Sequence, residues 1–267
     1  MSLAHLSQAI RNDRSSGQPL PTVWKSLEDA TAVFRRGATV IVAGGSGAGK
    51  SVFALTLAVR SGVSCIYFSA DSGPGTQLAR AVSMVTGTPE RECRDQIQRG
   101  YYFDNELAIL KQTRWDFDAG PTLDDIEDSL DAYGYLHGEY PELVIVDNLM
   151  NVVPDESGEG GRVNKENILL LLAELARDKG CCILILHHVV GQYDDGLTPI
   201  PMSGLMEKPS KTPEMILTLH RVEDSVYGDK LGVCIVKNRA GLANAGGGLV
   251  VELDMDLSKM ELKDQEM

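Results

Sequence analysis

The chain has 267 residues and a formal net charge of -13, from 38 acidic and 25 basic side chains. Hydrophobic residues make up 43% and charged residues 24%, a balance typical of a folded globular protein rather than a disordered one. The acidic balance excludes a globally basic nucleic-acid-binding protein. A few lysines and arginines that line one groove could still hold a phosphate backbone.

The five cysteines are odd in number and show neither CxxC nor zinc-finger spacing. We therefore expect reduced, mostly buried thiols, as in a cytoplasmic protein. No apolar run approaches membrane-spanning length, and the N-terminus lacks the apolar core of a signal peptide. The sequence thus predicts a cytoplasmic protein with no membrane partner.

The predicted elements begin with an N-terminal arm and lead-in over residues 1–36, followed by a regular domain over 37–253. In that domain the patterns predict strands at 39–43, 65–69, 113–117, 143–146, 181–186, 215–220, 233–237 and 249–253. They predict helices at 52–59, 76–84, 91–99, 122–136 and 164–176. Residues 254–267 are expected to form an acidic, solvated tail. Strands that are apolar on both faces and alternate with helices indicate an α/β fold, with a mainly parallel central sheet and helices on both faces.

A complete match to the pattern GxxxxGK[ST] lies between the first predicted strand and the first helix. It consists of Gly44, Gly45, Ser46, Gly47, Ala48, Gly49, Lys50 and Ser51. Glycines let the backbone wrap phosphates and turn successive N–H groups inward, and the helix that follows adds its positive N-terminal end. Lys50 is expected to reach the β- and γ-phosphates, and the Ser51 hydroxyl is expected to ligate Mg²⁺. ATP and Mg²⁺ are therefore the predicted cofactors.

Two further acidic residues follow predicted strands. Asp147 ends the strand 143–146 and is expected to hold Mg²⁺ through water, at the edge of the sheet where the P-loop lies. The next residue is Asn148 and not Glu, so a carboxylate that aligns the attacking water must come from another strand. Asp71 follows the strand 65–69 and is the candidate, although Asp before Ser-Gly-Pro is also ordinary turn chemistry.

These motifs resemble the RecA-like P-loop ATPase core, and most closely the motor domain of DnaB-type replicative helicases. The similarity covers nearly the whole chain from Leu20. It includes GKSVFALTLA after the P-loop, YFSADS where the family has Ser-Leu-Glu, MSGLMEKPSKTPEMILTLHR, and the Lys-x-Arg signature in VKNRAG. Asp71 occupies the place of the family's catalytic Glu.

The resemblance implies roles for three further residues. Lys237 and Arg239 would reach the γ-phosphate in a neighbouring subunit's P-loop, as an arginine finger and its partner. His188 stands where the family has a polar sensor of the γ-phosphate. The His187-His188 pair could equally be a structural pair or a metal site, but no third metal ligand is evident.

Two segments without predicted helices or strands fall where RecA-like motors carry DNA-binding loops. The first, Pro154–Lys165, offers Arg162 and Lys165, and the second, Gly191–Lys211, offers Lys208 and Lys211. In a ring of identical subunits, a few cations per loop would track single-stranded DNA without reading its sequence. Flexible surface loops without a DNA role remain the alternative.

The first function hypothesis is therefore an ATP-dependent DNA helicase or translocase, active as a homo-oligomer, a hexameric ring in the family, with a loader or primase as a further partner. A phage or plasmid origin would fit this minimal form, which would then act in the host cytoplasm. The arm leaves no room for the family's N-terminal helical domain, and Asp71 is one methylene shorter than Glu, where a small misplacement can slow catalysis. Two alternatives stay open: a RecA-like recombination or repair ATPase that forms filaments, and an ATP-binding assembly switch that hydrolyses slowly.

Overall fold

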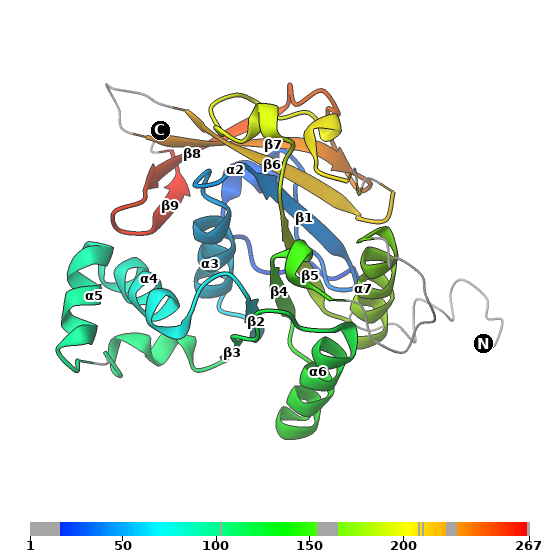
Figure 1. The fold of residues 1–267 in the computed structure, drawn as a ribbon. Helices are drawn as coiled ribbons and strands as arrows, with labels where there is room; N and C mark the ends of the chain where they lie inside the picture. Colours follow the sequence, from blue (N-terminus) through cyan, green and yellow to red (C-terminus); the bar gives the residue numbers. More distant parts are fainter. Residues whose placement is uncertain are drawn as a thin grey trace.

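The computed structural model describes residues 17–101, 103–153, 165–207, 209, 211–222 and 229–265. In these residues one sheet of nine strands has the order β3-β2-β4-β5-β1-β6-β7-β8-β9 (Figure 1). The strands are β1 Thr39–Gly44, β2 Cys65–Ser69, β3 Thr113–Asp116, β4 Leu143–Asp147, β5 Cys182–His187, β6 Met215–Val222, β7 Lys230–Asn238, β8 Val250–Asp256 and β9 Glu261–Asp264. Strands β1 to β6 pair in parallel, and β7 to β9 continue the sheet antiparallel.

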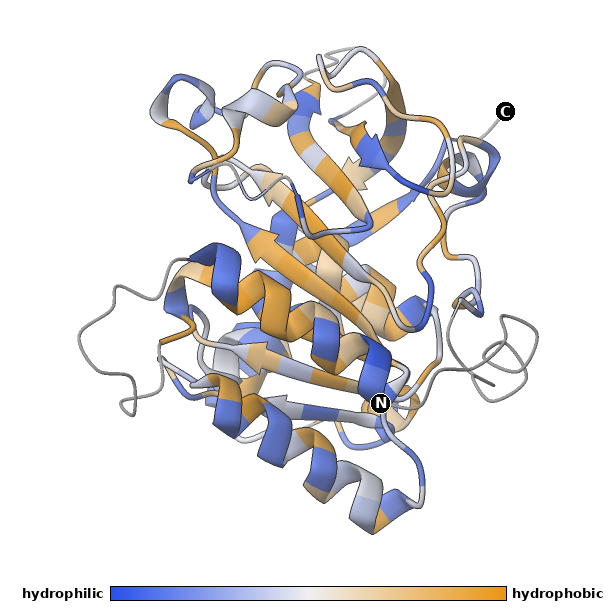
Figure 2. Ribbon diagram, turned by 90° about the vertical axis from the view of Figure 1, so that its right-hand side faces the viewer, coloured by the Kyte–Doolittle hydropathy of each residue, from blue (hydrophilic) through white to orange (hydrophobic). Residues whose placement is uncertain are grey.

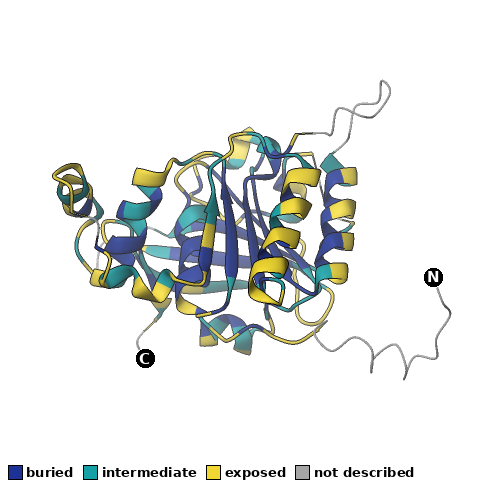
Figure 3. Ribbon diagram, turned by 90° about the horizontal axis from the view of Figure 1, so that it is seen from below, coloured by how far each residue is buried: buried dark blue, intermediate teal, exposed yellow. Residues whose placement is uncertain are grey.

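Helices cover both faces of this sheet. They are α2 Lys25–Asp29, α3 Lys50–Arg60, α4 Pro74–Thr86, α5 Glu90–Gln98, α6 Leu123–His137 and α7 Lys165–Lys179. In β1, Val40 and Val42 pack in the apolar layer with α3, whereas Ile41 and Ala43 pack in the layer with α6 and α7. The strands are therefore apolar on both faces, as Figure 2 shows for the centre of the sheet, and the helices expose only their outer sides (Figure 3). This confirms the predicted mainly parallel α/β fold.

Residues 17–36, the described part of the predicted N-terminal arm and lead-in, pack as part of the core. Trp24 is 2% exposed and stacks on Phe53 of α3, with 4.5 Å between the ring centroids. Leu20, Leu27 and Phe34 are also buried. Residues 1–16, where the rest of the expected arm falls, lie outside the described residues.

The expectation of a solvated acidic tail over residues 254–267 is wrong for 254–264, which form two paired strands and their turn. Strand β8 runs on to Asp256, and β9 pairs with it antiparallel, Leu253 opposite Asp264 and Met255 opposite Leu262. The side chains of Met260 and Leu262 are buried against the layer that contains Trp24. A strand with four residues and a single large apolar side chain carries too little periodicity to be recognised from its sequence.

Other boundaries differ from the prediction by a few residues, as in β5 and β7. All five cysteines are free and buried. Among the described residues, no helix is both long and apolar enough to cross a bilayer.

Candidate nucleotide-binding site

The P-loop lies between the end of β1 and the start of α3. Gly47 and Gly49 adopt positive φ angles of 72° and 101°, a backbone region that only glycine enters readily, so the loop can fold back over the helix end. The Lys50 ammonium donates to the carbonyl oxygens of Gly44 and Gly45 at 2.9 and 2.8 Å, which holds it across the loop. Burial lowers the pKa of Lys50, and the nearby carboxylates of Asp147, Asp194 and Asp71 oppose that shift.

Asp147 ends β4 at the same edge of the sheet. The residue is 5% exposed, and its carboxylate accepts a hydrogen bond from the Tyr67 hydroxyl over 3.1 Å. Burial raises the pKa of Asp147 to about 6; the Tyr67 hydrogen bond opposes the shift and the charge of Asp71 adds to it. A buried carboxylate with an incompletely compensated charge suits a cation, and Ser51 adds a hydroxyl from the start of α3. This hard oxygen donor set fits Mg²⁺.

Asp71 follows β2, which pairs in parallel with β4 so that Ser69 lies opposite Asp147. The side-chain nitrogen of Asn148 donates to a carboxylate oxygen of Asp71 over 2.5 Å. The backbone N–H of Ala70 also donates to Asp147 O at 3.0 Å, so the two strand ends are tied together. The role of Asn148 was missed from the sequence, where it counted only as the absence of a Glu.

The two histidines at the end of β5 lie in different environments. His187 is fully buried, and its Nε2 is 2.8 Å from Met206 O, which makes it part of the core. His188 is half-buried, and burial followed by the charge of Lys50 lowers its pKa, while Asp71 and Asp194 raise it. The charges of Lys50 and Asp71 therefore both act on His188, and its role as a sensor of the γ-phosphate stays a prediction.

A cavity of about 330 Å³ opens beside the P-loop. It is lined by Gly47, Gly49, Lys50, Ser51, Val52, Arg80, Glu90, Arg94, Leu257 and Met260. The turn between β8 and β9 is held against the start of α5, where Glu90 N–H donates to Ser258 O over 2.7 Å. Arginines and apolar side chains next to the phosphate loop suit the sugar and base of a nucleotide. Beyond the P-loop residues, no sequence motif pointed to these walls, which come from α4, α5 and the turn between β8 and β9.

Lys237 and Arg239 lie at the opposite edge of the sheet. Met215 pairs with both Val40, near the start of β1, and Asn238, at the end of β7. The P-loop begins at Gly44, four residues further along β1 than Val40, which is roughly 13 Å at about 3.3 Å per residue. The sheet itself therefore separates Lys237 and Arg239 from the P-loop of their own chain.

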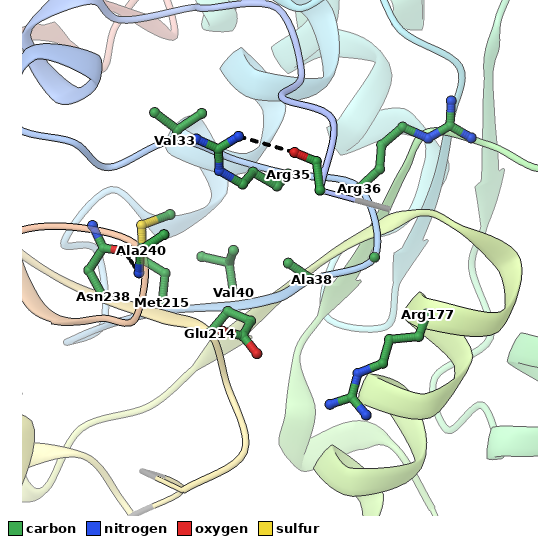
Figure 4. A pocket seen from close by; sticks show the side chains of 12 residues that line it. Val33, Arg35, Arg36, Ala38, Val40, Arg177, Glu214, Met215, Asn238 and Ala240 are labelled. Atoms are coloured by element: carbon green, nitrogen blue, oxygen red, sulfur yellow. Dashed lines mark hydrogen bonds between the residues drawn. The ribbon is translucent and has the colours of Figure 1, made fainter. Parts of the chain in front are cut away.

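Both cations are held by the segment before β6. Lys237 Nζ donates to Lys211 O at 3.0 Å, and Arg239 donates to the same oxygen at 2.6 Å. Arg239 also pairs with Glu214 at 3.0 Å. Burial, followed by the charge of Arg239, lowers the pKa of Lys237 to about 8. A cavity of about 300 Å³ lies alongside, where Arg177 extends from α7 and Asn238, Ala240 and Glu214 line the wall (Figure 4).

The expected DNA-binding cations divide into two groups. Arg162 and Lys208 lie outside the described residues. Lys165 donates to Met150 O and Val152 O at 3.1 and 2.8 Å, so its ammonium anchors the chain after β4, a placement that does not favour contact with DNA. Lys211 is exposed, with Glu166 at 3.7 Å.

The segment Gly191–Lys211 is not the open loop that the sequence suggests. It forms 3-10 turns at Gly191–Tyr193 and Met202–Gly204, and it buries Ile200 and Leu205. Ile200 O accepts a hydrogen bond from Thr218 of β6 at 2.6 Å, which fixes the segment on the sheet. Its first part covers the P-loop, and only its end reaches the Lys-x-Arg residues.

Known proteins are similar to this chain in sequence and in structure. The family model described as "AAA domain" matches residues 5–191. The Gene 65 protein of Mycobacterium phage L5 is 40% identical over 253 residues, which cover 94% of this chain and 94% of that protein. The Gene 65 protein of Mycobacterium phage D29 is 40% identical over 233 residues, 84% of this chain and 98% of that protein.

Three solved structures share the fold. One, described as an ATPase domain, superposes with a TM-score of 0.77 at 18% identity, over 98% of this chain and 96% of that one. The second is a DnaB-like replicative helicase, whose structure was described with its interactions with primase. It superposes with a TM-score of 0.76 at 17% identity, over 99% of this chain and 68% of that one. The RadB recombinase superposes with a TM-score of 0.62 at 18% identity, over 92% of this chain and 100% of that one. The chain therefore belongs to the AAA domain family, and it has the fold of the RecA-like P-loop ATPases, close to that of a DnaB-like motor domain.

Proposed function

We propose that this protein is an ATP-driven motor on single-stranded DNA, a helicase or translocase that assembles from identical subunits and hydrolyses ATP between them. The observation that carries the proposal is the division of the catalytic groups between two edges of one sheet. Lys50, Asp147 and Asp71 lie at one edge, and Lys237 and Arg239 lie at the other. A single copy cannot bring both sets to one triphosphate, whereas two adjacent copies can.

In this proposal each group has one task. The P-loop N–H groups and Lys50 bind the phosphates, and Ser51 and Asp147 would hold Mg²⁺, which neutralises phosphate charge when bound. Asp71 orients the attacking water, and His188 contacts the terminal phosphate. Lys237 and Arg239 of the adjacent copy place positive charge on the γ-phosphate, which stabilises the charge that develops as the bond breaks. The cavity bounded by Arg80 and Arg94 would take the nucleoside.

ATP hydrolysis is proposed to be coupled to DNA binding through the segment before β6, which contains Lys211. The carbonyl of Lys211 binds both Lys237 and Arg239, so a movement of this exposed segment on DNA would shift the two cations. Hydrolysis would then depend on the strand in the central channel. The proposal also includes a hexameric ring that acts on single-stranded DNA in the host cytoplasm. A primase or a loader would be its protein partner.

The test is a subunit-mixing assay. Lys50→Ala should lower ATP turnover by at least about 100-fold, because it removes a fixed cation from the phosphates, and Arg239→Ala should do the same. Mixing the two variants should restore part of the turnover, since some interfaces then join an intact P-loop to an intact finger. The control pairs Lys50→Ala with Arg99→Ala, a change at the exposed end of α5 that should leave turnover intact by itself. No rescue by the first mixture, with assembly intact by native mass spectrometry, would contradict the shared site.

A second assay separates the motor from its alternatives. Homopolymeric single-stranded DNA should raise ATP turnover, and a forked duplex should be unwound. A protein that hydrolyses ATP at the same slow rate with and without DNA would instead be the assembly switch. Electron micrographs with ATP and single-stranded DNA distinguish rings from the filaments that a recombinase would form.

A further inference from the structure

The loop Gly191–Leu197, which follows β5, lies directly on the P-loop. The Ser46 N–H donates to Oδ1 of Asp194 at 3.3 Å. A carboxylate is therefore already hydrogen-bonded to one of the successive P-loop N–H groups that are expected to bind phosphate. Burial lowers the pKa of both Lys50 and His188, and the charge of Asp194 opposes that shift at each of them. The Asp194 side chain thus lies on the P-loop, next to groups that are expected to contact the phosphates of a bound nucleotide.

Two glycines make this close approach possible. A Cβ built on Gly45 would lie 2.4 Å from Asp194 O, and one built on Gly196 would lie 3.1 Å from the Cβ of Ala48. The second glycine of the P-loop motif is therefore required for contact with the covering loop. Farther along, Gly196 O accepts a hydrogen bond from Arg221 N–H at 2.6 Å, which joins the loop to the end of β6.

We propose that Asp194 is a specificity-determining residue that opposes the γ-phosphate, so that the site distinguishes ATP from ADP by the displacement of Gly191–Leu197. The inference rests on the proposed function, since it requires a triphosphate in the P-loop. The carboxylate and the terminal phosphate carry like charges and compete for one N–H group. A diphosphate leaves Asp194 on Ser46, whereas a triphosphate repels it, and the covering loop moves away from Gly45.

This displacement has a direct route to the rest of the protein. Gly191–Leu197 leads into the segment that buries Ile200 and Leu205 and ends at Lys211, whose carbonyl holds Lys237 and Arg239. Binding of a γ-phosphate at one edge of the sheet would thereby change the positions of Lys237 and Arg239 at the other edge.

Asp194→Asn is the informative variant, because an amide keeps the acceptor for Ser46 N–H and removes only the charge. Isothermal titration calorimetry would compare ADP with a non-hydrolysable ATP analogue, each with and without Mg²⁺. We expect the preference for the analogue over ADP to rise about threefold or more, on the scale of an exposed charge interaction, and the gain to shrink in about 0.5 M salt. Asp195→Asn removes the same charge one residue away, where the carboxylate accepts from Leu197 N–H instead, and should leave the ratio unchanged.

The inference would be overturned if Asp194→Asn changed the affinities for ADP and for the ATP analogue equally, or if the Asp194 and Asp195 variants gave the same ratio of these affinities. The proposed function would still stand in either case, provided that the wild type binds the ATP analogue. A loss of analogue affinity in Asp194→Asn that appears only with Mg²⁺ would also overturn it, because Asp194 would then serve the metal. If the wild type binds neither nucleotide, both the inference and the proposed function fail.

Discussion

Asn148 and Asp71 join the ends of two neighbouring strands, through a hydrogen bond of 2.5 Å from the Asn148 amide nitrogen to the Asp71 carboxylate. Asn148 is 3% exposed, and its side-chain oxygen accepts from Met150 N–H at 2.8 Å, so its amide has a fixed orientation. One lone-pair direction of Asp71 is thereby defined. A carboxylate that must align a water benefits from this restraint, since small misplacements of reacting groups are costly.

Removal of the Asn148 amide should therefore slow turnover without weakening nucleotide binding. We expect Asn148→Ala to lower kcat about tenfold with little change in KM. Asn148→Asp keeps the acceptor for Met150 but sets a second carboxylate against Asp71, and should cost more. Steady-state kinetics checks the split between kcat and KM. The matched control is Asn151→Ala, which removes a hydrogen bond to Ala119 O outside the site and should leave kcat unchanged.

The elements with strong apolar periodicity could be predicted from the sequence. The strands of the sheet centre and the helices α3, α6 and α7 are fixed by local pattern, and the Thr122 and Asp125 capping box at the start of α6 is a local signal as well. The P-loop and Asp147 follow from their positions after such strands. These features depend on residues close together in the chain.

The features that were missed depend on contacts between distant segments. Strand β9 has one buried leucine, and its partner Trp24 is 238 positions away. The Asp194 loop lies on the P-loop because Gly45 and Gly196 permit the approach, which no periodicity reveals. The cavity beside the P-loop was missed for the same reason, because its other walls come from α4, α5 and the β8–β9 turn.

The buried charge of Asp147 should make the metal-free protein less stable than a neutral variant. Burial raises the folded-state pKa of this carboxyl to about 6 from its ordinary value of 3.8. The folded protein then holds the proton more tightly than the unfolded chain, so this group's contribution to stability falls as pH rises between these values and stays low above them. Asp147→Asn should thus be more stable by on the order of 2 kcal/mol at about pH 7.5.

Urea unfolding with chelator and without nucleotide measures this difference. The advantage of Asp147→Asn should shrink as the pH is lowered through about 6 towards about 4, where the wild-type carboxyl becomes neutral in both states. Asp178→Asn, an exposed change at the end of α7, should show no such gain. An equal or lower stability of Asp147→Asn at neutral pH would contradict the assignment of a destabilising buried charge. The same variant should lose Mg²⁺-dependent hydrolysis, a trade of function for stability.

Lys237 should give turnover a pH limit on the alkaline side. Burial and Arg239 lower its pKa to about 8, so its ammonium is protonated below that pH and loses its charge above it. At about pH 9 roughly a tenth of the side chains stay charged, and we expect turnover to fall about tenfold from its value at neutral pH. A guanidinium stays protonated throughout this range, so Lys237→Arg should keep its turnover to higher pH than the wild type.

The pH profile of kcat from neutral pH to about 9 tests this expectation. Lys230→Arg, at the other end of β7, is the matched control and should follow the wild type. Identical profiles for the wild type and Lys237→Arg would mean that the charge of Lys237 does not limit hydrolysis.

The C-terminal strand should be necessary for the stability of the ATPase core. Asp264 of β9 accepts from the backbone N–H groups of Lys25 and Ser26 at 2.7 and 3.2 Å, which are the unsatisfied donors at the start of α2. Trp24, just before α2, donates from its indole to Leu262 O at 3.4 Å and packs on Phe53. The first helix of the described chain is therefore capped and covered by the last strand.

Asp264→Ala should destabilise the protein by about 1 kcal/mol, the usual cost of a lost helix cap, and Trp24→Ala by about 3–5 kcal/mol, the cost of a large buried aromatic. Asp95→Ala, an exposed change on α5, serves as the control and should be neutral. Thermal and urea unfolding report the free energies. Because Met260 of the same hairpin lines the cavity beside the P-loop, a bound nucleotide should protect β9, and addition of ADP should raise the midpoint of both variants. If Asp264→Ala and Trp24→Ala both had the free energy of unfolding of the wild type, this prediction would be wrong. Residues 254–267 would then behave as the solvated tail that the sequence suggested.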